Sequence, residues 1–289
     1  MLTGTGIWSR ALRYGDQAEA ADAAAELEAL GYGALWVPDV GGDLFGAVGN
    51  LLTAAPRTTV ATGILNIWMH TAIDAARQFD ELTAAHGGRL LLGIGVSHAR
   101  LVDRASQVGT YQRPVEHIDA YLDDLDAADP PVPKDDRLLA ALGPRMLDVA
   151  RRRTAGTHLY LVTPEHTAAA RATLGAAPVV AVEQSVVLVE DRADAHAIAR
   201  QHLATYLDLP SYTNNWKRGG FTDDDLGGGG SDRLVDALYA WGDDSAIARR
   251  VGAHRDAGAT HVCVQVVTAD PAAFPRAEWR ALAPALASG

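Results

Sequence analysis

Short apolar runs alternate with amphipathic stretches along most of the chain. The runs beginning at Ala34, Leu90 and His261 (ALWV, LLLGIG and HVCVQV) lack the alternation of apolar and polar residues expected of a half-exposed strand. Between such runs, as in residues 16–30, apolar residues recur every three or four positions, which predicts helices. Strands that are apolar on both faces and separated by helices are typical of a parallel sheet covered by helices.

The strand-and-helix unit recurs eight times. Strands are predicted at 4–8, 34–39, 58–68, 89–95, 138–143, 158–162, 178–189 and 261–267. Asp16, Thr71 and Thr163 are predicted N-caps, and Pro144 is expected in the first turn of its helix. We therefore predict a (β/α)8 TIM barrel that occupies residues 1–289 as a single α/β domain. Segments 99–137 and 190–260 are too long for plain connections and are predicted to be insertions after strands 4 and 7.

Polar residues gather where the predicted strands end. Strand 2 ends in Asp39, strand 3 in Asn66 and His70, and strand 4 in Ser97 and His98. The carboxyl ends of barrel strands share one rim, where the active sites of TIM barrels lie. We therefore expect these side chains to converge on one site. Within strand 4, Gly93 and Gly95 are interpreted as positions where the backbone approaches a ligand closely.

Composition narrows the class of partner. The 289 residues carry 25 Lys and Arg against 36 Asp and Glu, a formal charge of -11, and no dense basic cluster, so nucleic acid is not expected as a partner. No run approaches the length of a membrane span, and no secretory leader begins the chain, so we expect a cytoplasmic protein without a membrane partner. The lone Cys263 excludes an internal disulfide framework.

Several catalytic classes are disfavoured by motif spacing. The GIGVSH stretch has His98 where a dinucleotide fingerprint needs its third glycine, and GGGGSDR lacks the lysine of a P-loop. No HExxH or paired-cysteine pattern predicts a metal site, and no G-x-S-x-G elbow predicts a serine hydrolase. A barrel of this kind is expected to obtain its chemistry from an organic cofactor.

A family resemblance spans residues 6–267. The segments ALWVPD, ATGILNIW, RLLLGIGVSHA, LLAALGPRMLDVARRR and SYTNNWKRGGFTDDDL, in this order and spacing, resemble the bacterial luciferase-like monooxygenase (LLM) superfamily and, within it, a branch of F420-dependent oxidoreductases. The resemblance implies a luciferase-like TIM barrel with a flavin or deazaflavin over the mouth. It also implies a non-prolyl cis peptide among residues 63–66. Because superfamily members are often dimers, it implies a possible homodimer.

The resemblance also assigns residues to the cofactor. Asp39 matches the strand-2 acid that contacts the deazaflavin ring, and the bulge, the loop after strand 4 and the turn after strand 5 match segments that hold the cofactor. The implied cofactor-binding residues are Asp39, Ile64, Leu65, Asn66, Gly95, Val96, Ser97, His98, Leu142, Gly143, Pro144, Arg145 and Met146. Trp8 and Trp68 are assigned to the substrate side or, equally, to packing. Arg10, Arg100, Arg104 and Arg145 are candidates for pairing with an anionic cofactor tail.

One departure from the resemblance affects the reaction. Sugar-phosphate and alcohol dehydrogenases of the superfamily carry a histidine directly after the strand-2 acid, where this chain has Val40. His70 or His98 is a candidate substitute as the catalytic acid or base beside Asp39; in the alternative, water supplies the proton. The predicted function is hydride transfer between coenzyme F420 and a small organic substrate. Two alternatives are an FMN-dependent two-component monooxygenase and a non-catalytic cofactor-binding barrel.

Overall fold

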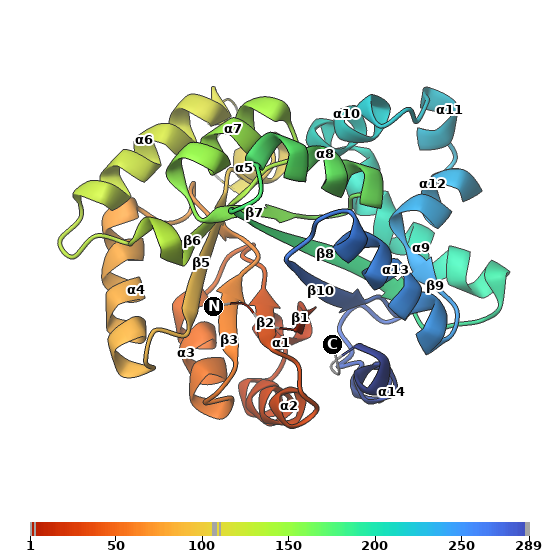
Figure 1. Cartoon of the computed structure of the whole chain (residues 1–289), viewed down its shortest axis with the longest axis horizontal. Helices are drawn as coiled ribbons and strands as arrows, with labels where there is room; N and C mark the ends of the chain where they lie inside the picture. The colour runs from red at the N-terminus through yellow and green to blue at the C-terminus, as the bar shows by residue number, and fades with distance from the viewer. Residues whose placement is uncertain (1, 3, 106–108, 110, 287–289) are drawn as a thin grey trace.

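The computed structural model describes residues 2, 4–105, 109 and 111–286. Eight parallel strands form a closed barrel, because β10 pairs with both β1 and β8 (Figure 1). The strands are β1 (Thr5–Trp8), β2 (Ala34–Val37), β3 (Thr59–Thr62), β5 (Leu90–Gly95), β6 (Arg137–Ala140), β7 (Gly156–Leu159), β8 (Val179–Val187) and β10 (His261–Val266), with the short β4 (Leu65–Asn66) on β5 and β9 (Ala240–Trp241) on β8. The predicted TIM barrel is confirmed.

Helices surround the barrel and cover its outer face (Figure 1). They are α1 (Ala11–Tyr14), α2 (Gln17–Ala29), α3 (Leu44–Ala54), α4 (Ala72–Ala85), α5 (Ala99–Ala105), α6 (Pro114–Ala127), α7 (Pro144–Arg153), α8 (Pro164–Leu174), α9 (Arg192–Leu207), α10 (Pro210–Arg218), α11 (Asp223–Leu226), α12 (Asp232–Leu238), α13 (Asp244–Asp256) and α14 (Arg276–Leu286), with a 3-10 turn, η1, at Lys134–Asp136. None of the helices in the described ranges has the length and hydropathy to cross a membrane.

Helix starts follow the predicted capping chemistry. The side chains of Asp16, Thr71 and Thr163 accept hydrogen bonds from backbone amides in the first turns of α2, α4 and α8. Pro144 occupies the first turn of α7, where its missing N–H leaves no intrahelical bond unmade. These local signals correctly predicted where α2, α4, α7 and α8 begin.

Most predicted strands differ from the structure by a few residues at their ends, and two of them differ in a way that has a clear local cause. The third, predicted at residues 58–68, divides into β3 and β4 around a cis peptide bond between Gly63 and Ile64. The sixth, predicted at residues 158–162, lies at Gly156–Leu159. It ends early because Leu161 has a positive φ of 51° and its N–H turns to a carboxylate oxygen of Glu183. Neither change alters the order of the barrel strands.

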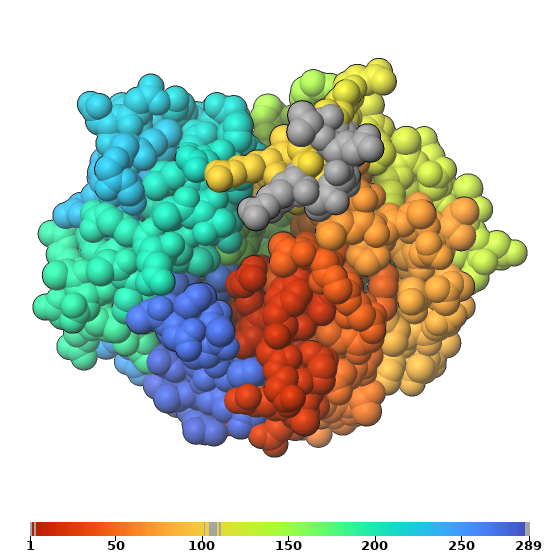
Figure 2. Space-filling view, turned by 180° about the vertical axis from the view of Figure 1, so that it is seen from behind, coloured from red at the N-terminus to blue at the C-terminus, as the bar shows by residue number. Residues whose placement is uncertain are grey.

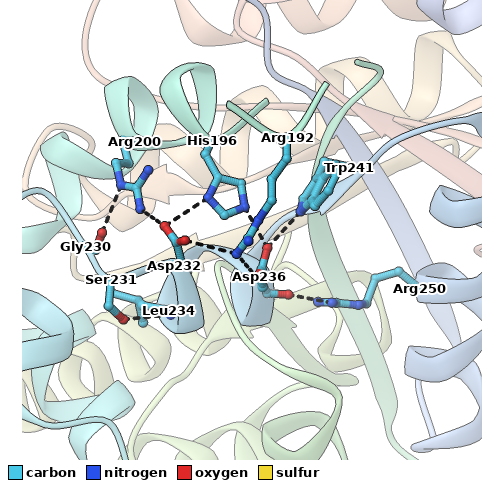
Figure 3. A network of polar contacts seen from close by, with 10 residues as sticks. All are labelled: Arg192, His196, Arg200, Gly230, Ser231, Asp232, Leu234, Asp236, Trp241 and Arg250. Atoms are coloured by element: carbon cyan, nitrogen blue, oxygen red, sulfur yellow. Dashed lines mark hydrogen bonds and ion pairs between the residues drawn. The ribbon is translucent and has the colours of Figure 1, made fainter. Parts of the chain in front are cut away.

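The predicted insertion after strand 7 contains α9 to α12, β9 and α13, on one side of the barrel (Figure 1). A polar network joins these elements to one another (Figure 3). Asp236 of α12 accepts hydrogen bonds from Trp241 Nε1 at 2.9 Å and Arg192 at 3.3 Å, and its Oδ1 lies 2.8 Å from His196 Nε2. Arg250 of α13 donates to the main-chain carbonyl of Asp236. The network holds α9 and α13 against α12 and β9.

Candidate active site

A buried carboxylate and a histidine meet at the rim of the barrel. Asp39 follows β2, and its Oδ2 lies 2.9 Å from His70 Nε2 and accepts the N–H of Asn66 at 3.0 Å. Its Oδ1 accepts the N–H of Gly41. Burial alone would raise the pKa of Asp39, but these hydrogen bonds outweigh burial and lower it. Asp39 therefore stays ionised, and His70 donates its Nε2 proton to the carboxylate.

The predicted cis peptide lies next to this pair. The bulge from Gly63 to Asn66 carries β4, which pairs with the end of β5 at Gly95. Trp8 Nε1 donates to the Gly63 carbonyl at 3.0 Å. Trp8 is buried, and its hydrogen bond ties the end of β1 to the bulge. The expectation of a non-prolyl cis peptide among residues 63–66 is confirmed.

The two glycines of β5 have a structural reason that sequence analysis missed. A Cβ on Gly93 would lie 2.0 Å from the carbonyl oxygen of Thr62. A Cβ on Gly95 would lie 2.9 Å from side-chain atoms of Ile64 and 3.1 Å from Ala140. The space in front of both glycines is filled by the protein itself. The packing of β3 and its bulge on β5 therefore accounts for both glycines, and the close approach of a ligand is not needed to explain them.

The loop after β5 turns toward the insertion rather than toward Asp39. Ser97 has a positive φ of 53°, and His98 Nδ1 lies 2.9 Å from Ser211 Oγ of α10. Removal from water lowers the pKa of His98 to about 4, so its imidazole is neutral near pH 7. Of the two candidate histidines, only His70 contacts Asp39. Val96 contributes its carbonyl to Trp68 Nε1 at 2.7 Å.

A positively charged side chain of α10 lies beside the turn after β6. Gly143 caps α7, and Arg218 of α10 donates to the Leu142 carbonyl at 3.4 Å. Arg218 has no carboxylate partner within the described residues. A Cβ on Gly143 would meet only the terminal Arg218 nitrogen, at 3.8 Å, so the helix N-terminus is open here. Arg218 was not among the predicted site residues, because nothing in the local sequence links α10 to α7.

His166, a half-buried residue of α8, is influenced by the positive charge of Arg218. Burial lowers the pKa of His166 to about 4, and the positive charge of Arg218 adds to the effect. His166 Nε2 is buried without a hydrogen-bond partner among the residues described. A helix N-terminus, an uncompensated guanidinium and an unpartnered polar nitrogen together fit the phosphate-bearing tail of a flavin or deazaflavin.

The other predicted arginines have different roles. Arg145 lies on the first turn of α7, 3.6 Å from Glu116, and is exposed. Arg100 pairs with Asp208 at 2.8 Å, also exposed. Arg10 lines a cavity beside β1 and α9. The side chain of Arg104 lies outside the described residues.

Trp68 packs against α6 and the loop after β5. Its ring stacks on His117 of α6, with ring centroids 3.9 Å apart and planes 1° from parallel, and its Nε1 is bonded to Val96. Pro144 and Met146 lie on the same first turn of α7 as Arg145, Pro144 exposed and Met146 half-buried.

A second acid lies inside the barrel and was not among the predicted site residues. Glu183 of β8 is in register with Cys263 of β10 and lies two residues after Ala181, so it is on the same face of the strand as Ala181. Ala181 and Cys263 both belong to one cluster of buried apolar side chains inside the barrel. Burial raises the pKa of Glu183 to about 7, although hydrogen bonds from Ser185 Oγ at 2.6 Å and Leu161 N–H at 3.1 Å oppose the rise. The signal in the sequence is one acidic residue within VVAVEQSVV.

The fold and the site define a luciferase-like α/β barrel with a carboxylate–imidazole pair at its mouth. The family model for luciferase-like monooxygenases matches residues 1–261, and the chain belongs to this family. Comparison with curated protein sequences gives no match.

Solved structures with the same fold include enzymes with different cofactors. An F420-dependent secondary alcohol dehydrogenase in complex with an F420–acetone adduct has a TM-score of 0.74 and 14% identity, with 99% of each chain covered. The coenzyme F420-dependent tetrahydromethanopterin reductase of Methanopyrus kandleri has 0.71 and 14%, also covering 99% of each chain. An FMN complex of the oxygenating constituent of 3,6-diketocamphane monooxygenase from Pseudomonas putida has 0.68 and 14%, covering 98% of this chain and 96% of that chain. At these identities the likeness concerns the fold.

Proposed function

We propose that the protein is a coenzyme F420-dependent oxidoreductase that transfers a hydride between the deazaflavin and a carbonyl or alcohol carbon of a small organic molecule. The observation that carries this proposal is the contact of 2.9 Å between Asp39 and His70. Val40, which stands where related dehydrogenases have a histidine, is 53% exposed. His70 supplies an imidazole to the same acid from 31 residues further along the chain.

The pair is suited to moving one proton. Asp39 accepts the Nε2–H of His70. The other ring nitrogen, Nδ1, has no hydrogen-bond partner among the described residues, so it can exchange a proton with the substrate. The deazaflavin, when bound, supplies or accepts the hydride. In the direction of carbonyl reduction, a C–H bond forms at the carbonyl carbon, the C=O π bond breaks, and the oxygen takes the proton from protonated His70. The reverse direction moves the same proton to Nδ1.

The positive groups near α7 support the cofactor part of the proposal. Gly143 and the N-terminus of α7 would hold a phosphate, with Arg218 beside them and Arg145 at the exposed edge. Asp39 and the bulge from Ile64 to Asn66 would lie against the ring. The molecule carries a formal charge of -11, so a polyanionic tail needs such locally placed cations.

The alternative is an FMN-dependent monooxygenase. The site at Gly143 and Arg218 would suit the phosphate of FMN equally well, which is the observation in its favour. A monooxygenase consumes molecular oxygen, whereas hydride transfer to or from a carbonyl carbon does not. Oxygen dependence therefore separates the two functions.

The test is anaerobic turnover of reduced F420 with a panel of aldehydes and ketones. We expect turnover without oxygen, and His70→Gln is expected to lower kcat by about 100-fold or more while the F420 dissociation constant changes little. His86→Gln is the matched control, because His86 is the C-cap residue of α4, at the opposite end of that helix from His70. Turnover that requires oxygen would instead support the monooxygenase, and tight F420 binding without turnover on any substrate would support the non-catalytic barrel.

A further inference from the structure

A cavity of about 370 Å³ opens beside the barrel mouth. It lies between the end of β1, the end of β10 and α9, and the segments that line it are the red, teal and blue ones that adjoin on the face seen in Figure 2. Trp8 belongs to its wall and also donates to the Gly63 carbonyl of the bulge. The cavity therefore shares a side chain with the proposed cofactor site, and a molecule bound in it would lie next to the mouth.

The inner wall of the cavity contains polar side chains, but these side chains already form hydrogen bonds with other protein groups. Tyr160 donates its hydroxyl proton to Gln265 Oε1 at 2.8 Å, so the Tyr206 hydroxyl, 2.8 Å from that of Tyr160, must be the donor in their contact. The Gln265 amide lies 3.2 Å from His202 Nε2, and His202 Nδ1 lies 2.8 Å from the Tyr239 hydroxyl.

These contacts also fix the tautomer of His202. The Gln265 amide can only donate, so His202 Nε2 accepts and Nδ1 carries the ring proton to Tyr239. Burial lowers the pKa of His202 to about 4, so the ring is neutral. What Trp8 and Tyr206 present to the cavity is therefore mainly ring surface, which suits a planar or apolar molecular body.

The rim of the cavity carries the charge. Arg10 has no ion pair with any carboxylate in the described part of the chain; its guanidinium lies 5.4 Å from the centre of the Tyr14 ring. Arg10 also lowers the pKa of His202, after the larger effect of burial, so its field reaches the inner wall. The other charged group, Asp270, is exposed and has one carboxylate oxygen bound to the Ala272 N–H of its own turn.

The neutral polar groups of the rim can each donate or accept a hydrogen bond. Gln201 and Thr205 of α9 line the cavity and are exposed. Ser9 accepts the Ala11 N–H, which leaves its own hydroxyl proton to donate. The uncompensated guanidinium of Arg10 therefore decides which ligand the rim favours, because a carboxylate meets a guanidinium with charge-assisted hydrogen bonds.

We propose that this cavity takes the carboxylate-bearing part of a small organic substrate, with the carboxylate at Arg10 and the planar or apolar body against Trp8 and Tyr206. This inference rests on the proposed function, because Trp8 joins the cavity to the cofactor site. It adds the class of substrate to that function: a carbonyl or alcohol compound that also carries a carboxylate.

The test is calorimetric binding of matched ligands to the full chain. The probes are benzoate and trans-cinnamate, their carboxamides, and benzylamine. We expect the carboxylates to bind about tenfold or more tightly than the carboxamides, since a charged hydrogen bond to Arg10 is worth at least that factor. Arg10→Gln is expected to abolish the preference, whereas Arg249→Gln, which removes an exposed arginine of α13, is expected to leave it intact.

Three results would overturn the inference. The first is equal affinity for the carboxylates and their carboxamides. The second is a preference for the carboxylates that remains in Arg10→Gln. The third is tighter binding of benzylamine than of the carboxylates, which would mean that Asp270 selects the charge of the ligand. Absence of binding by both carboxylates counts against it as well. A parallel F420 titration of the same sample keeps the two failures apart: intact cofactor binding without carboxylate preference overturns this inference alone, and loss of cofactor binding overturns the proposed function.

Discussion

Glu183 lies among apolar and aromatic side chains inside the barrel, and its ionisation is coupled to folding. Burial raises its pKa to about 7 from an ordinary value of 4.5, so in this interval the folded protein keeps a proton that the unfolded chain releases. The resulting stabilisation is complete below about pH 4.5 and is lost as the pH rises through 7. An acid of this kind makes the folded state less stable under alkaline conditions.

Replacing Glu183 by glutamine removes its contribution to the pH dependence of the free energy of unfolding. Glu183→Gln can donate to Ser185 Oγ while still accepting from the Leu161 N–H, so the fold is retained. Between about pH 5.5 and pH 8 the free energy of unfolding of the variant relative to wild type is expected to rise by roughly 2 kcal/mol. Urea denaturation at both pH values measures this, with the exposed Glu190→Gln as the control for the change in formal charge. A constant difference between variant and wild type would contradict it.

At the scale of elements, the site depends on how β3, β4 and β5 pack. The Cβ of a residue at position 95 would press on Ile64 and Ala140, so Gly95→Val is expected to displace the bulge. The expected cost is on the order of 1–3 kcal/mol of stability, together with weaker cofactor binding. Thermal unfolding and cofactor titration measure the two effects. Gly87→Ala provides a comparison with open space around the added methyl but a positive φ. Unchanged cofactor affinity in Gly95→Val would show that the bulge is not part of the site.

The same elements show what sequence can and cannot predict. Strand order, helix caps and the rim residues follow from local patterns, because period and capping act over a few residues. The contact of Asp39 with His70 spans 31 positions, and that of His98 with Ser211 spans 113, so no local pattern reports either. The packing role of Gly93 could not be predicted for the same reason: its steric partner, the Thr62 carbonyl, belongs to another strand.

At the scale of the whole molecule, buried neutral histidines set the response to acid. Burial lowers the pKa of His158 to about 3 and those of His202, His254 and His261 to about 4. Each takes up a proton on unfolding below its ordinary value of 6.5, so each contributes stability that is present above pH 6.5 and is lost as the pH falls toward 4. Glu183 acts in the opposite direction but is a single group.

Acid unfolding should therefore begin well above the pKa values of ordinary carboxyls. Each histidine removes about 1.4 kcal/mol per pH unit, so the free energy of unfolding is expected to fall by several kcal/mol between about pH 6.5 and pH 5. Urea denaturation across this range, followed by circular dichroism, measures the slope. A stability that stays flat down to about pH 5 would show that these imidazoles are not held neutral in the folded protein.

The central claim concerns the cofactor at the barrel mouth. The most direct measurement is a titration of the apo-protein with F420 and, separately, with FMN, followed by tryptophan fluorescence, in wild type and in Asp39→Asn and Arg218→Gln. We predict selective micromolar binding of F420, weakened about tenfold or more by either substitution. A preference for FMN, or F420 binding that neither substitution affects, would contradict it.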